Sequence, residues 1–115
     1  MRAIFINAKE QTVSYVENKG QLEDLYNTLG VEMVEIGKYW PNGDHLYVDE
    51  EGLINGTDWG FTLNSVDYVG NGLIYGMDLD HPGAEGSCVT RIEDIQVDFF
   101  KLVKSKHLEG TANRF

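Results

Sequence analysis

The sequence contains little cysteine, proline or positive charge, and it has no long apolar run. There are one cysteine and two prolines among 115 residues. A single cysteine excludes an internal disulfide framework and is typical of a reducing compartment, so we expect Cys88 to be a small buried apolar residue. No segment approaches the roughly 18 apolar residues of a membrane span, and no charged-then-apolar leader opens the chain. These absences predict a soluble, cytoplasmic protein with no membrane partner.

The length of the chain limits the number of domains. A chain of 115 residues can bury roughly two thirds of its unfolded surface, which is enough to fold without a disulfide, a metal or another cofactor. The sequence shows no internal repeat and no linker, and its last residues become polar and small. We therefore expect one domain over residues 1–104 and a disordered tail over residues 105–115.

Positive charge is unevenly distributed as well as scarce. The formal net charge is −10, and between Tyr39 and Phe100 only Arg91 is basic. The twelve acidic residues of that block are Asp44, Asp49, Glu50, Glu51, Asp58, Asp67, Asp78, Asp80, Glu85, Glu93, Asp94 and Asp98. Such a block repels phosphate backbones and attracts basic surfaces. It therefore disfavours direct nucleic-acid binding and favours a basic protein partner.

The most informative segment is Val31–Leu53, in which two runs of strand-forming residues flank Pro41-Asn42-Gly43. The proline presets φ for the first corner of a type I turn, and Gly43 can take the left-handed position that closes a three-residue hairpin loop. This loop sets Trp40 opposite Asp44. The segment therefore predicts a β-hairpin with Gly43 at positive φ.

The register of this hairpin assigns its side chains to two faces, because alternate residues of a strand point to opposite sides. It sets Lys38 opposite Leu46 and Ile36 opposite Val48. The face predicted to be core collects Val34, Ile36, Leu46 and Val48. The other face also carries Glu35, and together with the turn and the acidic run it gives the predicted binding residues: Tyr39, Asp44, His45, Tyr47, Asp49, Glu50 and Glu51.

The residues before the hairpin predict two strands and a helix. Ala3–Ala8 is continuously apolar and Thr12–Glu17 alternates, which favours an antiparallel strand pair. In Gln21–Leu29 the apolar residues recur at helical spacing, and Gly30 supplies a C-terminal stop. We expect this helix to cross one face of the sheet.

The second half is rich in glycine, which argues against helix. We expect brief strands at residues 60–63, 66–69 and 73–77, a hairpin turn at Asn71-Gly72 and a surface loop over Asp78–Ser87. Thr90 and Glu93 fit a capping box for a short helix, and residues 97–103 predict a final strand mostly buried on both faces. The predicted fold class is α+β: a compact single domain with a mostly antiparallel, strongly bent sheet or partial barrel and one or two short helices.

The segment from Trp40 to Leu53, WPNGDHLYVDEEGL, resembles the centre of a family of small proteins of unknown function from bacteriophages, plasmids and other mobile elements. The resemblance covers roughly Met1–Gly56. It implies a mobile-element origin, a bacterial host and an accessory or host-takeover role. It assigns no catalytic residues.

Other side chains offer chemistry without matching a known signature. Asp78, Asp80 and His81, or His45 with Asp44 and Asp49, present metal-binding atoms at spacings that fit no ligand motif. Cys88 or a serine would need a histidine partner, and no nucleophile motif is present. An aromatic surface for a base, drawn from Tyr39, His45, Tyr47, Trp59 and Tyr68, would repel phosphate through the nearby acids. We therefore predict no catalytic residue, no metal site and no cofactor.

Three classes of function remain open. The first, which we take as the working prediction, is a non-enzymatic acidic protein that binds and inhibits a basic, nucleic-acid-binding host protein, in the manner of counter-defence factors such as anti-CRISPR proteins. The second is a protein that sequesters a small nucleotide-like signal in a pocket between sheet and loops. The third is a metal-dependent hydrolase or nuclease. We expect a monomer or a small homo-oligomer.

Overall fold

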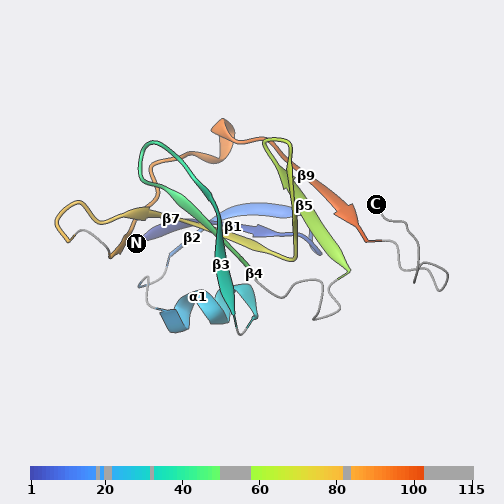
Figure 1. Cartoon of the computed structure of the whole chain (residues 1–115), viewed down its shortest axis with the longest axis horizontal. Coiled ribbons are helices and arrows are strands. Elements are labelled where there is room, and N and C mark those ends of the chain that lie inside the picture. Colours follow the sequence, from blue (N-terminus) through green and yellow to red (C-terminus); the bar gives the residue numbers. More distant parts are fainter. Residues whose placement is uncertain (18, 20–21, 32, 50–57, 82–83, 103–115) are drawn as a thin grey trace.

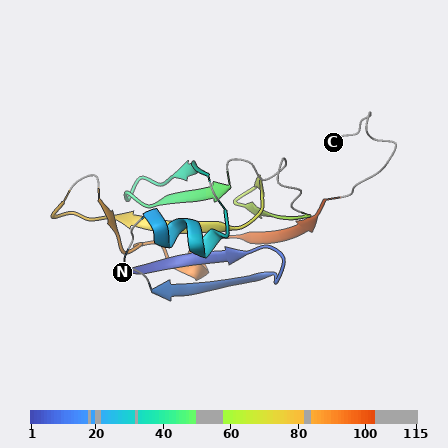
Figure 2. The same cartoon turned by 90° about the horizontal axis from the view of Figure 1, so that it is seen from below.

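Two antiparallel β-sheets and one α-helix are stacked in three layers (Figures 1 and 2). The computed structural model describes residues 1–17, 19, 22–31, 33–49, 58–81 and 84–102. The large sheet has the strand order β2-β1-β7-β4-β3, with β8 paired to β7, and the small sheet has the order β6-β5-β9. The described residues form one compact domain of mostly antiparallel strands, and neither sheet closes into a barrel.

The strand boundaries follow the alternation of apolar residues closely. The strands of the large sheet are β1 (Arg2–Asn7), β2 (Thr12–Glu17), β3 (Val34–Tyr39), β4 (His45–Asp49), β7 (Gly72–Met77) and β8 (Glu85–Gly86). Those of the small sheet are β5 (Trp59–Leu63), β6 (Val66–Val69) and β9 (Val97–Lys101). The predicted N-terminal strand pair is confirmed, with Arg2 opposite Glu17 and Asn7 opposite Thr12.

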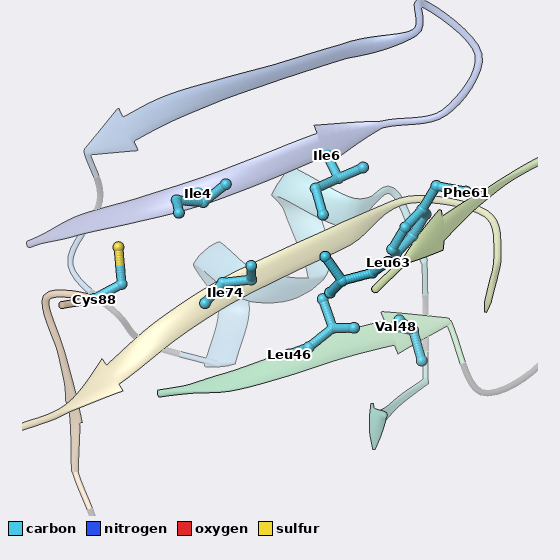
Figure 3. Close-up of a cluster of buried hydrophobic side chains, with 8 residues drawn as sticks. All are labelled: Ile4, Ile6, Leu46, Val48, Phe61, Leu63, Ile74 and Cys88. Carbon is cyan, nitrogen blue, oxygen red and sulfur yellow. The ribbon is translucent and has the colours of Figure 1, made fainter. Parts of the chain in front are cut away.

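The hydrophobic core lies on both faces of the large sheet. Between the two sheets, side chains of β1, β4 and β7 face those of β5 (Figure 3): Ile4, Ile6, Leu46, Val48, Phe61, Leu63, Ile74 and Cys88. On the opposite face, Leu25 and Leu29 of helix α1 (Leu22–Leu29) pack on Leu73 and Tyr75. The predicted helix and its docking on one sheet face are therefore confirmed. Gly30 ends the helix at φ +72.

The central hairpin has the predicted loop, but its register changes inside β3. Gly43 adopts φ +95, and the Trp40 amide donates to the Asp44 carbonyl. Lys38 lies opposite Leu46 as predicted, but a β-bulge between Ile36 and Lys38 places Ile36 opposite Tyr47 instead of Val48. The prediction that Ile36 belongs to the core is therefore wrong, because one extra residue turns its side chain to the other face. The bulge also turns Val34 away from the face predicted for it, and Val34 packs on the helix side of the sheet.

Two predictions for the second half are corrected. Asn71-Gly72 is no hairpin turn, because β7, which begins at Gly72, pairs with β1 and β4, whereas β6 pairs with β5. The tight turn is at Asn64-Ser65, where both residues have positive φ, as a two-residue hairpin requires. The final strand β9 is only partly buried, because it lies at a sheet edge. Val103 and the predicted tail lie outside the described residues.

The predicted capping box does not form, and the fold is accordingly closer to all-β than to α+β with two helices. The segment holds a three-residue 3₁₀ turn, η1 (Ile92–Asp94), whose N-cap is Arg91 without a side-chain cap bond. Thr90 is buried, and its hydroxyl accepts a hydrogen bond from the Asn42 side chain. Its oxygen is engaged by the hairpin loop, so it does not cap a helix.

The segment after β8 crosses the large sheet directly over Gly76. A Cβ at this glycine would lie 2.1 Å from the Ser87 carbonyl oxygen. The crossing is fixed to β1, since the Arg2 amide donates to the Ser87 hydroxyl and the Cys88 amide donates to the Arg2 carbonyl. Gly76 is therefore required for close approach of two backbones.

The loop geometry predicts the effect of changing Gly43. Gly43→Val should lower the free energy of unfolding by about 2 kcal/mol or more, because a β-branched residue strongly disfavours φ > 0. The new Cβ would also lie 3.2 Å from Met77 Cε. Gly43→Asn is the control, since asparagine tolerates the left-handed region, and it should cost clearly less. Urea denaturation measures both, and equal losses would contradict the assigned loop.

Candidate functional site

Three polar side chains from two strands meet at one end of the large sheet. His45 and Tyr47 are alternate residues of β4, and Glu85 reaches them from β8. His45 Nε2 lies 2.7 Å from one Glu85 oxygen, and the Tyr47 hydroxyl donates to the other. The histidine and glutamate side chains are only 13% and 21% exposed. This cluster attaches the short strand β8 to β4.

The hydrogen bonds of His45 define its charge. Its Nδ1 lies 3.1 Å from the Gly43 carbonyl oxygen, which is an acceptor only, and its Nε2 faces a carboxylate. Both ring nitrogens thus face acceptors, an arrangement that favours the doubly protonated, positively charged imidazole. The hydrogen bond to Glu85 raises the pKa of His45 above its ordinary value, and the bond to Gly43 adds to this while burial opposes it. No ring nitrogen is left to act as a general base or a metal ligand.

Aromatic rings extend this cluster along the helix side of the sheet. Tyr39, His45, Tyr47 and Tyr75 form successive ring contacts with centroids 5.3 to 6.2 Å apart. Burial, with the bond to Glu85, raises the pKa of Tyr47 far above its usual range. Of the four, only Tyr39 is largely exposed, at 70%. The other rings support the fold more than they offer a surface.

Asp44 does not belong to an exposed face. Its side chain is fully buried, and its carboxylate accepts hydrogen bonds from the backbone amides of Val89 and Thr90 at 2.6 to 3.1 Å. Its own backbone amide donates to the Asn42 side-chain oxygen at 2.9 Å. A buried carboxylate is tolerated when such donors replace water. Asp44 therefore links the hairpin loop to the segment that follows β8.

The remaining acids of the predicted block are divided among several places. Asp49 is 8% exposed, and Glu50 and Glu51 lie outside the described residues. Asp67 and Asp98 flank Thr62 on the small sheet, and Asp94 pairs with Arg91 at η1. Asp78 and Glu85 lie at the β7–β8 end. The described acids thus do not form one continuous surface centred on the hairpin.

One groove lies at the β7–β8 end, beside the His45 cluster. Its volume is about 450 Å³, and Met1, Asn42, Met77, Asp78, Leu79, Glu85, Gly86, Ser87 and Val89 line it. Met77, Leu79 and Val89 are exposed by 44%, 83% and 64%, so apolar area remains open to solvent there. Two carboxylates lie on its wall: Glu85 is paired with His45, and Asp78 lies 3.3 Å from His81 Nδ1. None of the lining residues has a basic side chain, although the amino-terminal residue Met1 is among them. Below, these residues are called the acidic groove.

This groove was not predicted from the sequence. Part of the predicted surface loop Asp78–Ser87 is strand β8, which pairs with β7. The available signal was the alternation of Met77 and Leu79 with Asp78 and Asp80, because apolar residues in an otherwise polar loop are unusual. Val89 gave no such signal, since only the crossing over Gly76 brings it to the groove.

The other candidates for chemistry are separated or engaged. His81 Nδ1 lies 3.3 Å from Asp78, which also accepts a bond from the Asp80 amide, as in an ordinary turn. Cys88 is buried as predicted, and burial raises the pKa of its thiol. Tyr68 stacks on Phe61, and Trp59 lies beneath Lys101. Within the described part of the chain, no group of three or more His, Cys, Asp or Glu side chains is placed to hold a metal ion.

Comparisons with known proteins add no relative. Neither protein-family models, nor curated proteins, nor solved structures give a match to the chain. In the described part of the chain, no helix has the length and apolar character needed to cross a membrane.

The role of Asp44 predicts a large loss of stability when its charge is removed. Asp44→Asn should lower the free energy of unfolding by about 2–4 kcal/mol, because an amide nitrogen would then face backbone donors in a buried place. Asp98→Asn is the control at an exposed carboxylate and should change it by less than about 0.5 kcal/mol. Equal effects in urea denaturation would show that Asp44 is not a structural link.

The His45 cluster predicts a pH dependence of stability. The folded pKa of His45 lies above the unfolded value of about 6.5. Its stabilisation is therefore complete below pH ~6.5 and is lost as pH rises through the folded pKa. Glu85→Gln should flatten this decline, since it removes the charge but keeps an acceptor. Tyr47→Phe leaves the ion pair intact and should preserve the decline. Urea denaturation between pH 6 and about pH 9 tests this, and an unchanged slope in Glu85→Gln would contradict it.

Proposed function

We propose that this protein is a non-enzymatic binding protein whose acidic groove takes up a basic and partly apolar segment of a partner protein. The observation that carries the proposal is the combination of exposed Met77, Leu79 and Val89 with Asp78 and Glu85 on one concave surface. Apolar side chains supply contact area, while carboxylates select a basic partner and orient it.

The geometry of the His45 cluster supports binding over catalysis. A general base needs a free nitrogen or oxygen directed at its substrate. Both His45 nitrogens and both Glu85 oxygens are already hydrogen-bonded within the chain. The cluster instead holds one wall of the groove in place, which lowers the entropy lost when a partner binds.

The negative charge of the chain indicates which class of protein it would bind. The acidic balance of residues 39–100 favours basic surfaces, which nucleic-acid-binding proteins carry. The resemblance of the central hairpin to proteins of phages and plasmids points to a host protein of that class, which the groove would inhibit by occupying its nucleic-acid surface. The proposal keeps the counter-defence role predicted from the sequence. Its binding surface is the acidic groove instead of the hairpin face.

A small ligand is the second candidate, because about 450 Å³ lies within the range of ligand pockets. A nucleotide signal suits the groove poorly, since its phosphates would meet the carboxylates of Asp78 and Glu85. A small cation with an apolar body would fit better. The groove is also open to solvent, as the exposure of Leu79 shows, which favours a protein segment.

A labelled peptide of alternating lysine and leucine tests the proposal by fluorescence anisotropy. The double variant Asp78→Asn/Leu79→Ser should bind it at least about tenfold more weakly than the unchanged protein. Asparagine keeps the acceptor for the Asp80 amide, so the local turn is retained. Raising the salt concentration should weaken binding as well, because charges at the rim are screened.

The control is Val66→Ser/Asp98→Asn, which makes the same kinds of change at exposed residues of the small sheet. It should leave the affinity unchanged. Equal weakening in both double variants, or equal affinity for a glutamate-leucine peptide, would overturn the groove as a selective site. Tight binding of ATP with no binding of the basic peptide would favour the nucleotide alternative.

A further inference from the structure

Strand β3 is an open edge of the large sheet. It pairs with β4 on one side, and no described strand pairs with its other side. Exposed apolar side chains gather on and just before this strand: Met33, Ile36 and Tyr39 are exposed by 44%, 37% and 70%. An unpaired edge with apolar side chains is a template for a further strand.

The β-bulge of β3 changes which of its side chains share a face. Glu35 and Lys38 lie opposite Val48 and Leu46, so both are on the face toward the small sheet. In a regular strand, residues three apart would point to opposite faces. By the same shift, the other face of β3 collects Val34, Ile36 and Tyr39, which lie opposite Asp49, Tyr47 and His45.

This arrangement is self-complementary in an antiparallel pair of two copies. The two-fold axis of such a pair is perpendicular to the sheet, so residues that meet must lie on the same face. With the axis at Ile36-Gly37, Glu35 meets Lys38 of the second copy and Val34 meets Tyr39 of the second copy. Both pairs satisfy the face requirement, and at the centre Ile36 meets the bulged Gly37, which has no side chain to oppose it. Opposite charges and aromatic–β-branched pairs are the favourable cross-strand combinations.

We propose that β3 pairs with β3 of a second copy, so that the large sheets of two chains become one continuous sheet in a symmetric homodimer. The Ile36 side chains approach each other near the axis. Each Glu35 forms an ion pair with Lys38 across the interface. This assembly is independent of the acidic groove and does not rest on the proposed function.

The bulge is fixed by a contact from the small sheet. The Tyr68 hydroxyl donates to the Gly37 carbonyl at 2.9 Å, and its ring lies 2.6 Å from where a Cβ of residue 37 would be. That carbonyl is satisfied within the chain, so the dimer does not depend on it. The faces of Glu35 and Lys38 are therefore set before two copies meet.

Strand β9 provides an internal comparison. It is also an edge strand, and its Asp98 and Lys101 have the same spacing as Glu35 and Lys38. Its register is regular, with Asp98 opposite Thr62 and Lys101 opposite Trp59, so the two charges lie on opposite faces. They cannot pair across a symmetric interface. Of these two edge strands, only the bulged one is self-complementary in this way.

The size of the interface sets the expected affinity. A short strand pair buries less than the ~1,600 Å² of a standard interface, so we expect a dissociation constant in the micromolar range. Sedimentation velocity of the full chain from about 1 to about 500 µM should show a concentration-dependent rise from 13.0 kDa toward twice that mass. A constant monomer mass over this range would overturn the proposal.

A charge swap tests the register. Glu35→Lys and Lys38→Glu should each weaken dimerisation roughly tenfold or more, because two attractive pairs become repulsive. The double variant Glu35→Lys/Lys38→Glu should restore it. Asp98→Lys and Lys101→Glu on β9 are the matched controls and should leave it unchanged. Dimerisation that survives both single reversals, or that is not restored by the double variant, would overturn this interface.

A second variant of the interface is needed if a charge reversal impairs folding. Circular dichroism would reveal such a folding defect. Ile36→Lys changes a side chain that is already exposed, and it places two positive charges near the axis. It should leave the far-ultraviolet spectrum intact and abolish the dimer over the same concentration range. A dimer that persists in this folded variant would contradict pairing through β3.

Discussion

The described fold depends on the buried carboxylate of Asp44. This side chain lies at the end of the hairpin loop and accepts hydrogen bonds from Val89 and Thr90. Because a buried charge is costly unless its donors are in place, the loop and the segment after β8 must be ordered together. That segment brings Cys88 into the core between the sheets and Val89 to the groove. The acidic groove therefore depends on the hydrogen bonds that the Asp44 carboxylate accepts.

The large sheet carries the protein's two candidate surfaces at separate places. At the β7–β8 end, the His45–Glu85–Tyr47 cluster holds the wall of the acidic groove. At the β3 edge, a bulge held by Tyr68 arranges Glu35 and Lys38 on one face. Both surfaces are built on strands whose opposite sides are packed, so their geometry is largely preorganised. A dimer through β3 would carry two copies of the groove, and a partner with repeated basic segments would gain affinity from both.

The acidic composition acts in more than one way. Asp44 contributes to structure, Glu85 contributes to the His45 cluster and to the groove, and Asp94 pairs with a neighbouring arginine. Only part of the charge is therefore available to a partner. Because the acidic residues are divided in this way, their number along the chain does not locate a charged surface.

Local patterns in the sequence determined the strands other than β8, the helix with its glycine stop and the hairpin loop with Gly43, because turn chemistry and periodicity act over a few residues. They did not reveal the bulge at Gly37, which depends on Tyr68 from another sheet. They also gave Thr90 the wrong role, because the hydroxyl that would cap a helix instead accepts a hydrogen bond from the Asn42 side chain. The burial of Asp44 and the groove beside β8 were decided only by tertiary structure, because their partners lie 40 or more residues away in the chain.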